Sequence, residues 1–196
     1  MTTSGRTARG TKGAITTQAR PRTRYTVDPT ACAVLVEARS NVGEVSFGTR
    51  ALSGGMELVR LDGRVDTTSH PCVQLSVPLA SLTSGNALYD AELQQRLAVQ
   101  RYPVVTISLT DSQPAGGDDY LVSGQVTLHG VTALLRGAVT VTFPDDESVL
   151  VVGEQVVDIR DFEIDLPSVL MLRIYPDVKV SLHLVARRSP SPGTGI

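Results

Sequence analysis

The sequence predicts an all-β fold, an antiparallel β-barrel of about eight strands with one helix. Apolar residues alternate with polar ones at a period of two over much of the chain, which is typical of strands with one buried face. These runs are numerous and separated by turn residues, as in barrels and sandwiches. Valine and leucine dominate them, and aromatic residues make up only 4% of the chain. The core and any cavity are therefore expected to be aliphatic.

The length and composition indicate one folded domain with a tail at each end. The 196 residues suit a single core, and 41% hydrophobic against 19% charged residues is typical of a globular chain. Residues 1–24 show no hydrophobic period, and residues 187–196 are rich in proline and glycine. We expect the folded body to cover residues 25–186.

The expected strands follow in chain order through this body. Strict alternation predicts strands at Val73–Leu79, Val105–Thr110, Tyr120–Leu128, Val139–Phe143 and Val178–Leu184. Weaker candidates cover residues 25–39, 44–50, 56–61 and 154–165.

Residues 86–100 have helical spacing instead. Tyr89, Leu93 and Leu97 lie four residues apart on one stripe, and Asn86 is a suitable N-cap. Acidic residues lie near the start and basic residues near the end, which suits the helix dipole: Asp90, Glu92, Arg96 and Arg101. Pro103 cannot continue the helix. We expect this helix to cover part of the barrel and to close one mouth.

The net charge of −2 conceals an asymmetry, because residues 1–24 carry +6 and the remainder carries −8. A solvated leader is the favoured interpretation of this tail. Weak contact of Arg6–Arg24 with an anionic membrane is the alternative. We expect no nucleic-acid partner, because no aromatic residues interleave with the basic ones and the body is acidic. The chain shows no secretory signal and no membrane-spanning run, so we expect a cytoplasmic protein.

No motif for a metal or a catalytic centre is found. His70, His129 and His183 lack metal-ligand spacing, and we expect no metal. Cys32 and Cys72 are either small buried hydrophobes or a disulfide, and the sequence leaves both open. The charges of Asp158–Asp165 favour a solvated strand face with ion pairs, and Asp145–Glu147 is interpreted as a hairpin loop.

Four segments, in this order, resemble the YceI-like family. They are Tyr25-Thr-Val-Asp-Pro29, Ser81-Leu-Thr-Ser-Gly85 with Asp90 and Tyr102-Pro103, Gly124-Gln-Val-Thr-Leu-His-Gly-Val-Thr132, and Ile159-Arg-Asp-Phe162. The chain departs from the family pattern at Ala31-Cys32, where a histidine–serine pair is usual, and at Glu163, where glycine is usual. The resemblance implies a lipocalin-like barrel whose lumen holds a polyisoprenoid or a similar amphiphile.

The leading hypothesis is therefore a non-enzymatic carrier that transports or sequesters an apolar ligand. No cofactor is expected apart from a bound isoprenoid or quinone-like lipid, and the sequence leaves open whether the barrel forms a homodimer. Alternation alone does not distinguish a ligand cavity from a filled core at the candidate lumen residues: Leu75, Val77, Ile107, Val122, Val126, Val139, Val141, Leu172, Val180 and Leu182.

Two other classes of function stay open. A small-barrel isomerase or cyclase needs a polar group inside the lumen, and Tyr120, Tyr175 and His129 are its first candidates. A filled barrel that serves as an interaction module would use Arg6–Arg24 to bind its partner.

Overall fold

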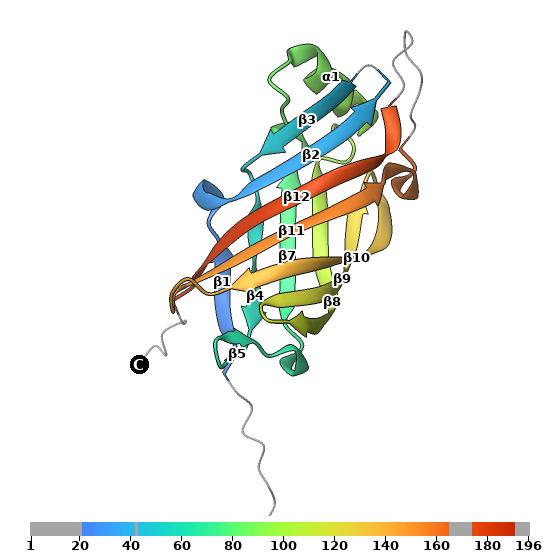
Figure 1. Cartoon of the computed structure of the whole chain (residues 1–196). Coiled ribbons are helices and arrows are strands. Elements are labelled where there is room, and N and C mark those ends of the chain that lie inside the picture. The colour runs from blue at the N-terminus through green and yellow to red at the C-terminus, as the bar shows by residue number, and fades with distance from the viewer. Residues whose placement is uncertain (1–20, 42, 165–173, 191–196) are drawn as a thin grey trace, which may run out of the picture.

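The computed structural model describes residues 21–41, 43–164 and 174–190, which form one antiparallel sheet, a small hairpin, one α-helix and four 3-10 turns (Figure 1). The strands are β1 Thr23–Val27, β2 Ala33–Ser40, β3 Gly43–Thr49, β4 Ser53–Leu58, β5 Arg60–Leu61, β6 Arg64–Val65, β7 Cys72–Pro78, β8 Val104–Gly116, β9 Asp119–Leu128, β10 Val131–Thr142, β11 Ser148–Asp158 and β12 Ile174–Arg188. The helix α1 is Ala87–Arg96, and the 3-10 turns are η1 Pro29–Ala31, η2 Thr67–Ser69, η3 Leu79–Ser81 and η4 Ile159–Phe162.

Eight of the strands close into a ring. Their order is β1-β4-β7-β8-β9-β10-β11-β12, and β12 pairs back onto β1. All neighbours are antiparallel. Closure pairs β1 with β12, so neither end of the eight-strand series is left as the edge of an open sheet. The antiparallel barrel with one helix is thus confirmed.

Strands β1 and β2 pair with successive parts of the same edge of β12, whose other edge pairs with β11, and β3 extends the sheet beyond β2. Pro29 separates β1 from β2, since it has no N–H to donate to a ladder. Asp28 accepts a hydrogen bond from the Thr30 backbone N–H (3.1 Å) and so starts η1. One run expected over residues 25–39 is consequently two strands.

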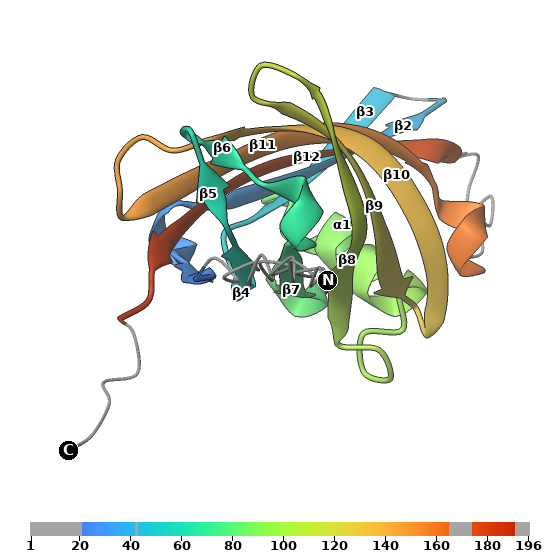
Figure 2. The same ribbon diagram turned by 90° about the horizontal axis from the view of Figure 1, so that it is seen from below.

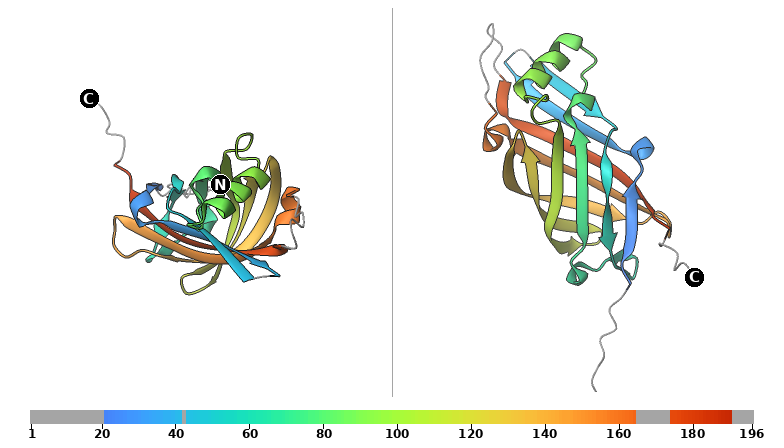
Figure 3. Two further views of the ribbon diagram at one scale, coloured as in Figure 1. Left: turned by 90° about the horizontal axis from the view of Figure 1, so that it is seen from above. Right: turned by 180° about the vertical axis from the view of Figure 1, so that it is seen from behind.

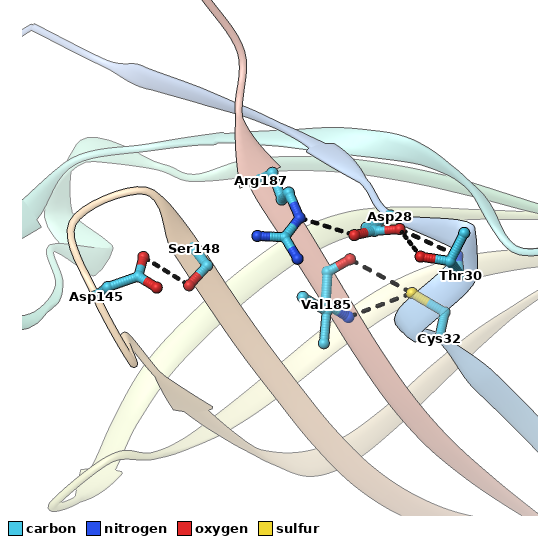
Figure 4. Close-up of polar contacts among 7 residues, drawn as sticks. All are labelled: Asp28, Thr30, Cys32, Asp145, Ser148, Val185 and Arg187. Atoms are coloured by element: carbon cyan, nitrogen blue, oxygen red, sulfur yellow. Dashed lines mark hydrogen bonds and ion pairs between the residues drawn. The ribbon is translucent and has the colours of Figure 1, made fainter.

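The same junction is tied to β12 by side chains (Figure 4). Arg187 Nε donates to Asp28 Oδ2 at 2.8 Å. The sulfur of Cys32 contacts the backbone of Val185, accepting from its N–H (3.2 Å) and donating to its carbonyl (3.4 Å). Cys32 is buried, Cys72 is exposed, and both are free thiols.

Different elements lie over the two ends of the barrel. Helix α1 lies at the upper end (Figure 3, left), and the β5–β6 hairpin lies at the lower end (Figure 2). Two apolar clusters correspond to these ends. The lower one is centred on residues such as Tyr25, Met56 and Leu184, and the upper one on Phe47, Leu97 and Phe162.

One junction in the wall is short. Strands β10 and β11 pair only from Val139–Gly153 to Thr142–Leu150, which is four residue pairs, whereas β9–β10 has ten and β11–β12 has eleven. Residues 131–138 of β10 and 154–158 of β11 have no ladder between them, and the two strands diverge toward η4 (Figure 2). We call this unpaired stretch the β10–β11 seam.

Several expected boundaries are corrected. The strand expected over 154–165 is wrong in its bounds, because the chain leaves β11 at Asp158, whose carboxylate accepts from Arg160 N (2.9 Å) and starts η4. Arg160 and Asp158 do form an ion pair. β1 begins at Thr23 and β12 ends at Arg188, so the folded body is slightly longer than 25–186 at both ends. Residues 1–20 and 191–196, which make up most of the expected tails, lie outside the described residues.

Candidate functional site

The barrel encloses a cavity of about 600 Å³, which we call the lumen. Pockets of roughly 300–1,000 Å³ are the usual size for binding an organic ligand. The lumen walls come from β2, β3, β4, β7, β8, β9, β10, β11, β12 and α1. Most lining side chains are aliphatic. The interior is therefore a cavity and not a core filled throughout by side chains.

The alternation seen in the sequence decides which residues reach the lumen. On β9 the even-numbered residues Tyr120, Val122, Val126 and Leu128 line it, and on β10 the odd-numbered residues from Leu135 to Val141 do so. Their chain neighbours Leu121 and Leu134 point outward and are each 55% exposed. Period two thus separates a lumen face from a solvent face.

Nine of the ten candidate lumen residues lie on the cavity wall, and Leu172 lies outside the described residues. Leu75 and Val77 are buried, and the others are intermediate in exposure. Val122 and Val180 line the lumen without belonging to either apolar cluster. Whether these side chains contact a ligand is taken up as a proposal below.

Helix α1 presents a second wall. Tyr89, Leu93 and Leu97, the stripe expected from the sequence, face the lumen together with Glu92 and Arg96. The N-cap is as expected, with Asn86 Oδ1 accepting from Leu88 N at 3.0 Å. Sequence reasoning assigned Glu92 and Arg96 only to the helix dipole and missed that both face inward. Glu92 follows Tyr89 by three residues and Arg96 follows Leu93 by three, and this spacing is the signal that could have found them.

Asp90 fixes the loop that leads into α1. Its carboxylate accepts from Thr83 Oγ1 (2.6 Å) and from both N and Oγ of Ser84 (2.7 Å each). The hydrogen bond from Thr83, followed by those from Ser84, lowers the pKa of Asp90. The Thr83-Ser84 and Asp90 elements of the sequence pattern therefore position the helix over the lumen.

The His129-Gly130 pair forms the tight turn between β9 and β10. Both residues have positive φ, 55° and 80°, as two-residue hairpins of this kind require. His129 Nδ1 lies 3.3 Å from the Phe162 carbonyl oxygen, and its ring meets Tyr102 edge-on at 5.1 Å between centroids. His129 does not line the lumen, so its visible contacts join the hairpin to η4 and to the segment after α1.

The three polar residues that an enzymatic function would use, Tyr120, Tyr175 and His129, do not come together in the lumen. Tyr120 lines the lumen near its lower end, where its hydroxyl accepts the Val65 backbone N–H at 2.9 Å. Tyr175 is 42% exposed and does not line the lumen. Burial raises the pKa of the Cys32 thiol, which favours the less nucleophilic protonated form. The described residues hold no cluster of three metal-ligating side chains.

Within the described ranges, no helix is long and apolar enough to cross a membrane. The basic residues from Arg6 to Arg20, and with them most of the proposed membrane-contact segment, lie outside these ranges. Arg22 and Arg24 are described, and both bind the barrel. Arg22 Nη2 donates to the Ser69 carbonyl (2.6 Å), and Arg24 Nε donates to Glu57 (2.8 Å).

Comparison with known proteins gives one family and several structural neighbours. The family model of the YceI-like domain matches residues 25–186. BcnA of Burkholderia cenocepacia is 20% identical, with a TM-score of 0.69 over 81% of this chain and 98% of that one. A polyisoprenoid-binding domain from Saccharophagus degradans, implicated in plant cell wall breakdown, is also 20% identical, with a TM-score of 0.67 over 84% and 98%.

A YceI protein of Campylobacter jejuni is more distant, at 14% identity and a TM-score of 0.59 over 71% of this chain and 82% of that one. No curated protein matches the chain. At these identities the structural likenesses establish the fold.

Proposed function

The chain belongs to the YceI-like family, and from its lumen we propose that it binds a polyisoprenoid or a similar amphiphilic lipid as a non-enzymatic carrier. The observation that carries this proposal is the aliphatic cavity of about 600 Å³ inside a closed barrel. The name of the Saccharophagus degradans neighbour, a polyisoprenoid-binding domain, supports the same class of ligand.

The physical basis is the transfer of hydrocarbon out of water. Each buried methylene-sized group contributes roughly 0.8 kcal/mol, less the entropy lost when the chain is ordered. The candidate lumen residues, Val122, Val126, Val139 and Val180 among them, have no hydrogen-bonding side-chain atoms. Such a wall selects for chain length and shape, and it suits an isoprenoid tail better than a polar substrate.

The direct experiment is native mass spectrometry of the protein purified from its own host, followed by organic extraction. The proposal expects a bound mass in stoichiometric amount that extracts as a prenyl lipid or a quinone-like lipid. An apo mass, together with no thermal shift from a panel of isoprenoids, would contradict it.

A matched pair of variants tests whether the lumen is the site. Val122 and Leu121 are adjacent on β9, and the first points into the lumen while the second points outward. Val122→Phe fills part of the cavity, so we expect the affinity for a long prenyl chain to fall at least tenfold, with a shorter chain less affected. Leu121→Phe should leave the affinity unchanged. The affinities are measured by fluorescence-displacement titration. If both variants change the affinity equally, the lumen is not the binding site.

A further inference from the structure

The lumen has a charged pair on its α1 wall. Positions 89, 92, 93, 96 and 97 follow one face of the helix and all line the cavity. Glu92 and Arg96 are therefore directed toward the same space as Leu93 and Leu97. Arg96 Nη2 forms an ion pair with Glu92 Oε1, and the Arg96 side chain is only 16% exposed.

The guanidinium of Arg96 is incompletely paired. Its Nε is buried and has no hydrogen-bond partner among the described residues. Leaving a buried donor unsatisfied is destabilising, and more so when the group is charged. An i,i+4 ion pair on a helix contributes little to stability. The bond to Glu92 is thus too weak to account for placing an arginine here on structural grounds.

Other charged residues that border the lumen are placed differently. Arg136 and Glu154 occupy outward positions of β10 and β11, Glu44 lies opposite the outward Arg39 on β2, and all three are exposed. In the described part of the chain, the Glu92–Arg96 pair is the charged group on the inner face. At the opposite end the lumen is bordered mainly by apolar side chains such as Met56, Leu58 and Val65.

We infer that Arg96, held in place by Glu92, binds the polar end of the ligand by donating a hydrogen bond to an oxygen atom. The ligand then lies with its oxygen-bearing end under α1 and its hydrocarbon tail toward the β5–β6 hairpin. This inference rests on the proposed function and adds an orientation and a class of headgroup to it. Because Glu92 offsets the charge of Arg96, the shared chemistry is an oxygen acceptor, neutral or anionic.

The test uses three probes with similar prenyl-type chains and different ends. Phytane has no polar end, geranylgeranylacetone has a neutral ketone, and geranylgeranyl monophosphate has an anion. Arg96→Met keeps the length and packing of the side chain and removes its donors. Arg101→Met is the matched control, because Arg101 is exposed, does not line the lumen and stacks on Tyr102 at 5.1 Å.

We expect Arg96→Met to weaken binding of at least one oxygen-bearing probe about tenfold or more while leaving phytane unchanged. An effect on the ketone assigns a neutral headgroup, and an effect on the phosphate alone assigns an anionic one. Arg101→Met should change none of the three affinities. Arg96→Lys, which keeps a donor and a charge, should retain part of the affinity. This variant replaces Arg96→Met in the test if the methionine variant fails to fold.

Equal weakening of all three probes, or no change in any, would overturn the role of Arg96 and leave lumen binding intact. If the unmodified protein binds none of the probes, the carrier function itself fails. The two failures are therefore distinguishable in the same titration.

Discussion

Glu163 ends the turn η4 with its backbone in the left-handed region, at φ 54°. Its N–H donates to the Arg160 carbonyl at 3.0 Å, which closes the turn. A residue with a Cβ is strained in this region, whereas glycine is not. This explains in physical terms why glycine is usual in the family at this position, and why the departure at Glu163 leaves the turn in place.

The strain predicts a stabilising substitution. Glu163→Gly should raise the free energy of unfolding by roughly 0.5–1 kcal/mol, because glycine relieves the left-handed strain. Gln125→Gly, in the extended interior of β9, is the control and should lower it by a similar amount. Urea unfolding of the two variants measures both changes. A destabilised Glu163→Gly protein would show that the side chain makes contacts that outweigh the strain.

Single residues also show how far the sequence could predict the site. Alternation was enough to place nine candidates such as Val122 and Leu182 on the lumen wall, because period two fixes the face of a strand. It could not decide between a cavity and a filled core, which depends on how far apart opposite walls stand. Arg96 was missed because a basic residue at a helix C-terminus already has a sufficient explanation in the dipole.

At the scale of elements, strongly patterned segments were predicted well and boundaries less so. The helix expected over 86–100 occupies Ala87–Arg96, because Ala98 turns to φ 45° without a glycine to signal the end. The start of β11 was missed, since Val149, Leu150, Val151 and Val152 form a continuous apolar run with no alternation. Its end was misplaced because Asp158, read as a strand residue, caps a turn.

Asp28 links the turn η1 to β12 and gives this junction a dependence on pH. Its hydrogen bond from Thr30, followed by that from Arg187, holds the pKa of the carboxyl below its ordinary value of 3.8. A carboxyl with a lowered folded-state pKa stabilises the fold above the unfolded pKa, and this stabilisation is lost as the pH falls through the folded value.

We therefore expect Asp28→Asn to lower the Tm at neutral pH and to lose this difference at acid pH. Asparagine keeps the acceptor for Thr30 N and removes the charge opposite Arg187. The difference in Tm from the unmodified protein should be constant from about pH 7 to 5 and should shrink below about pH 4. A difference that persists undiminished at pH 2–3 would show that the charge is not its source.

At the scale of the whole molecule, the closed ring depends on pairings that no local pattern reveals. Tyr25 on β1 pairs with Arg188 on β12, so the first and last strands of the barrel meet. Alternation predicts strands and buried faces, but a barrel and a sandwich share that signal. The ordered family resemblance made the choice between them, and the ring closure confirms it.

The β10–β11 seam predicts that the backbone amides of β10 are unevenly protected from hydrogen exchange. Amides between Val131 and Ala138 that point toward β11 have no ladder partner there, whereas those that point toward β9 lie in a continuous ladder. We expect the first set to exchange with solvent deuterium much faster than the second, because exchange follows local opening. Hydrogen-exchange NMR resolves alternate residues of one strand. Uniform protection along β10 would show that the seam is closed in solution.

If the lumen holds a lipid as proposed, the seam would affect how quickly the lipid exchanges and not how tightly it is bound. Gln155 lies across it, with Oε1 only 2.8 Å from where a Cβ on Gly137 would stand. Both residues border the lumen. If the wall parted there, it would open sideways along the length of a guest, without displacing α1 or the β5–β6 hairpin. The residence time of a long chain would then be set by the width of this slit, while the number of methylenes buried inside would set its equilibrium occupancy.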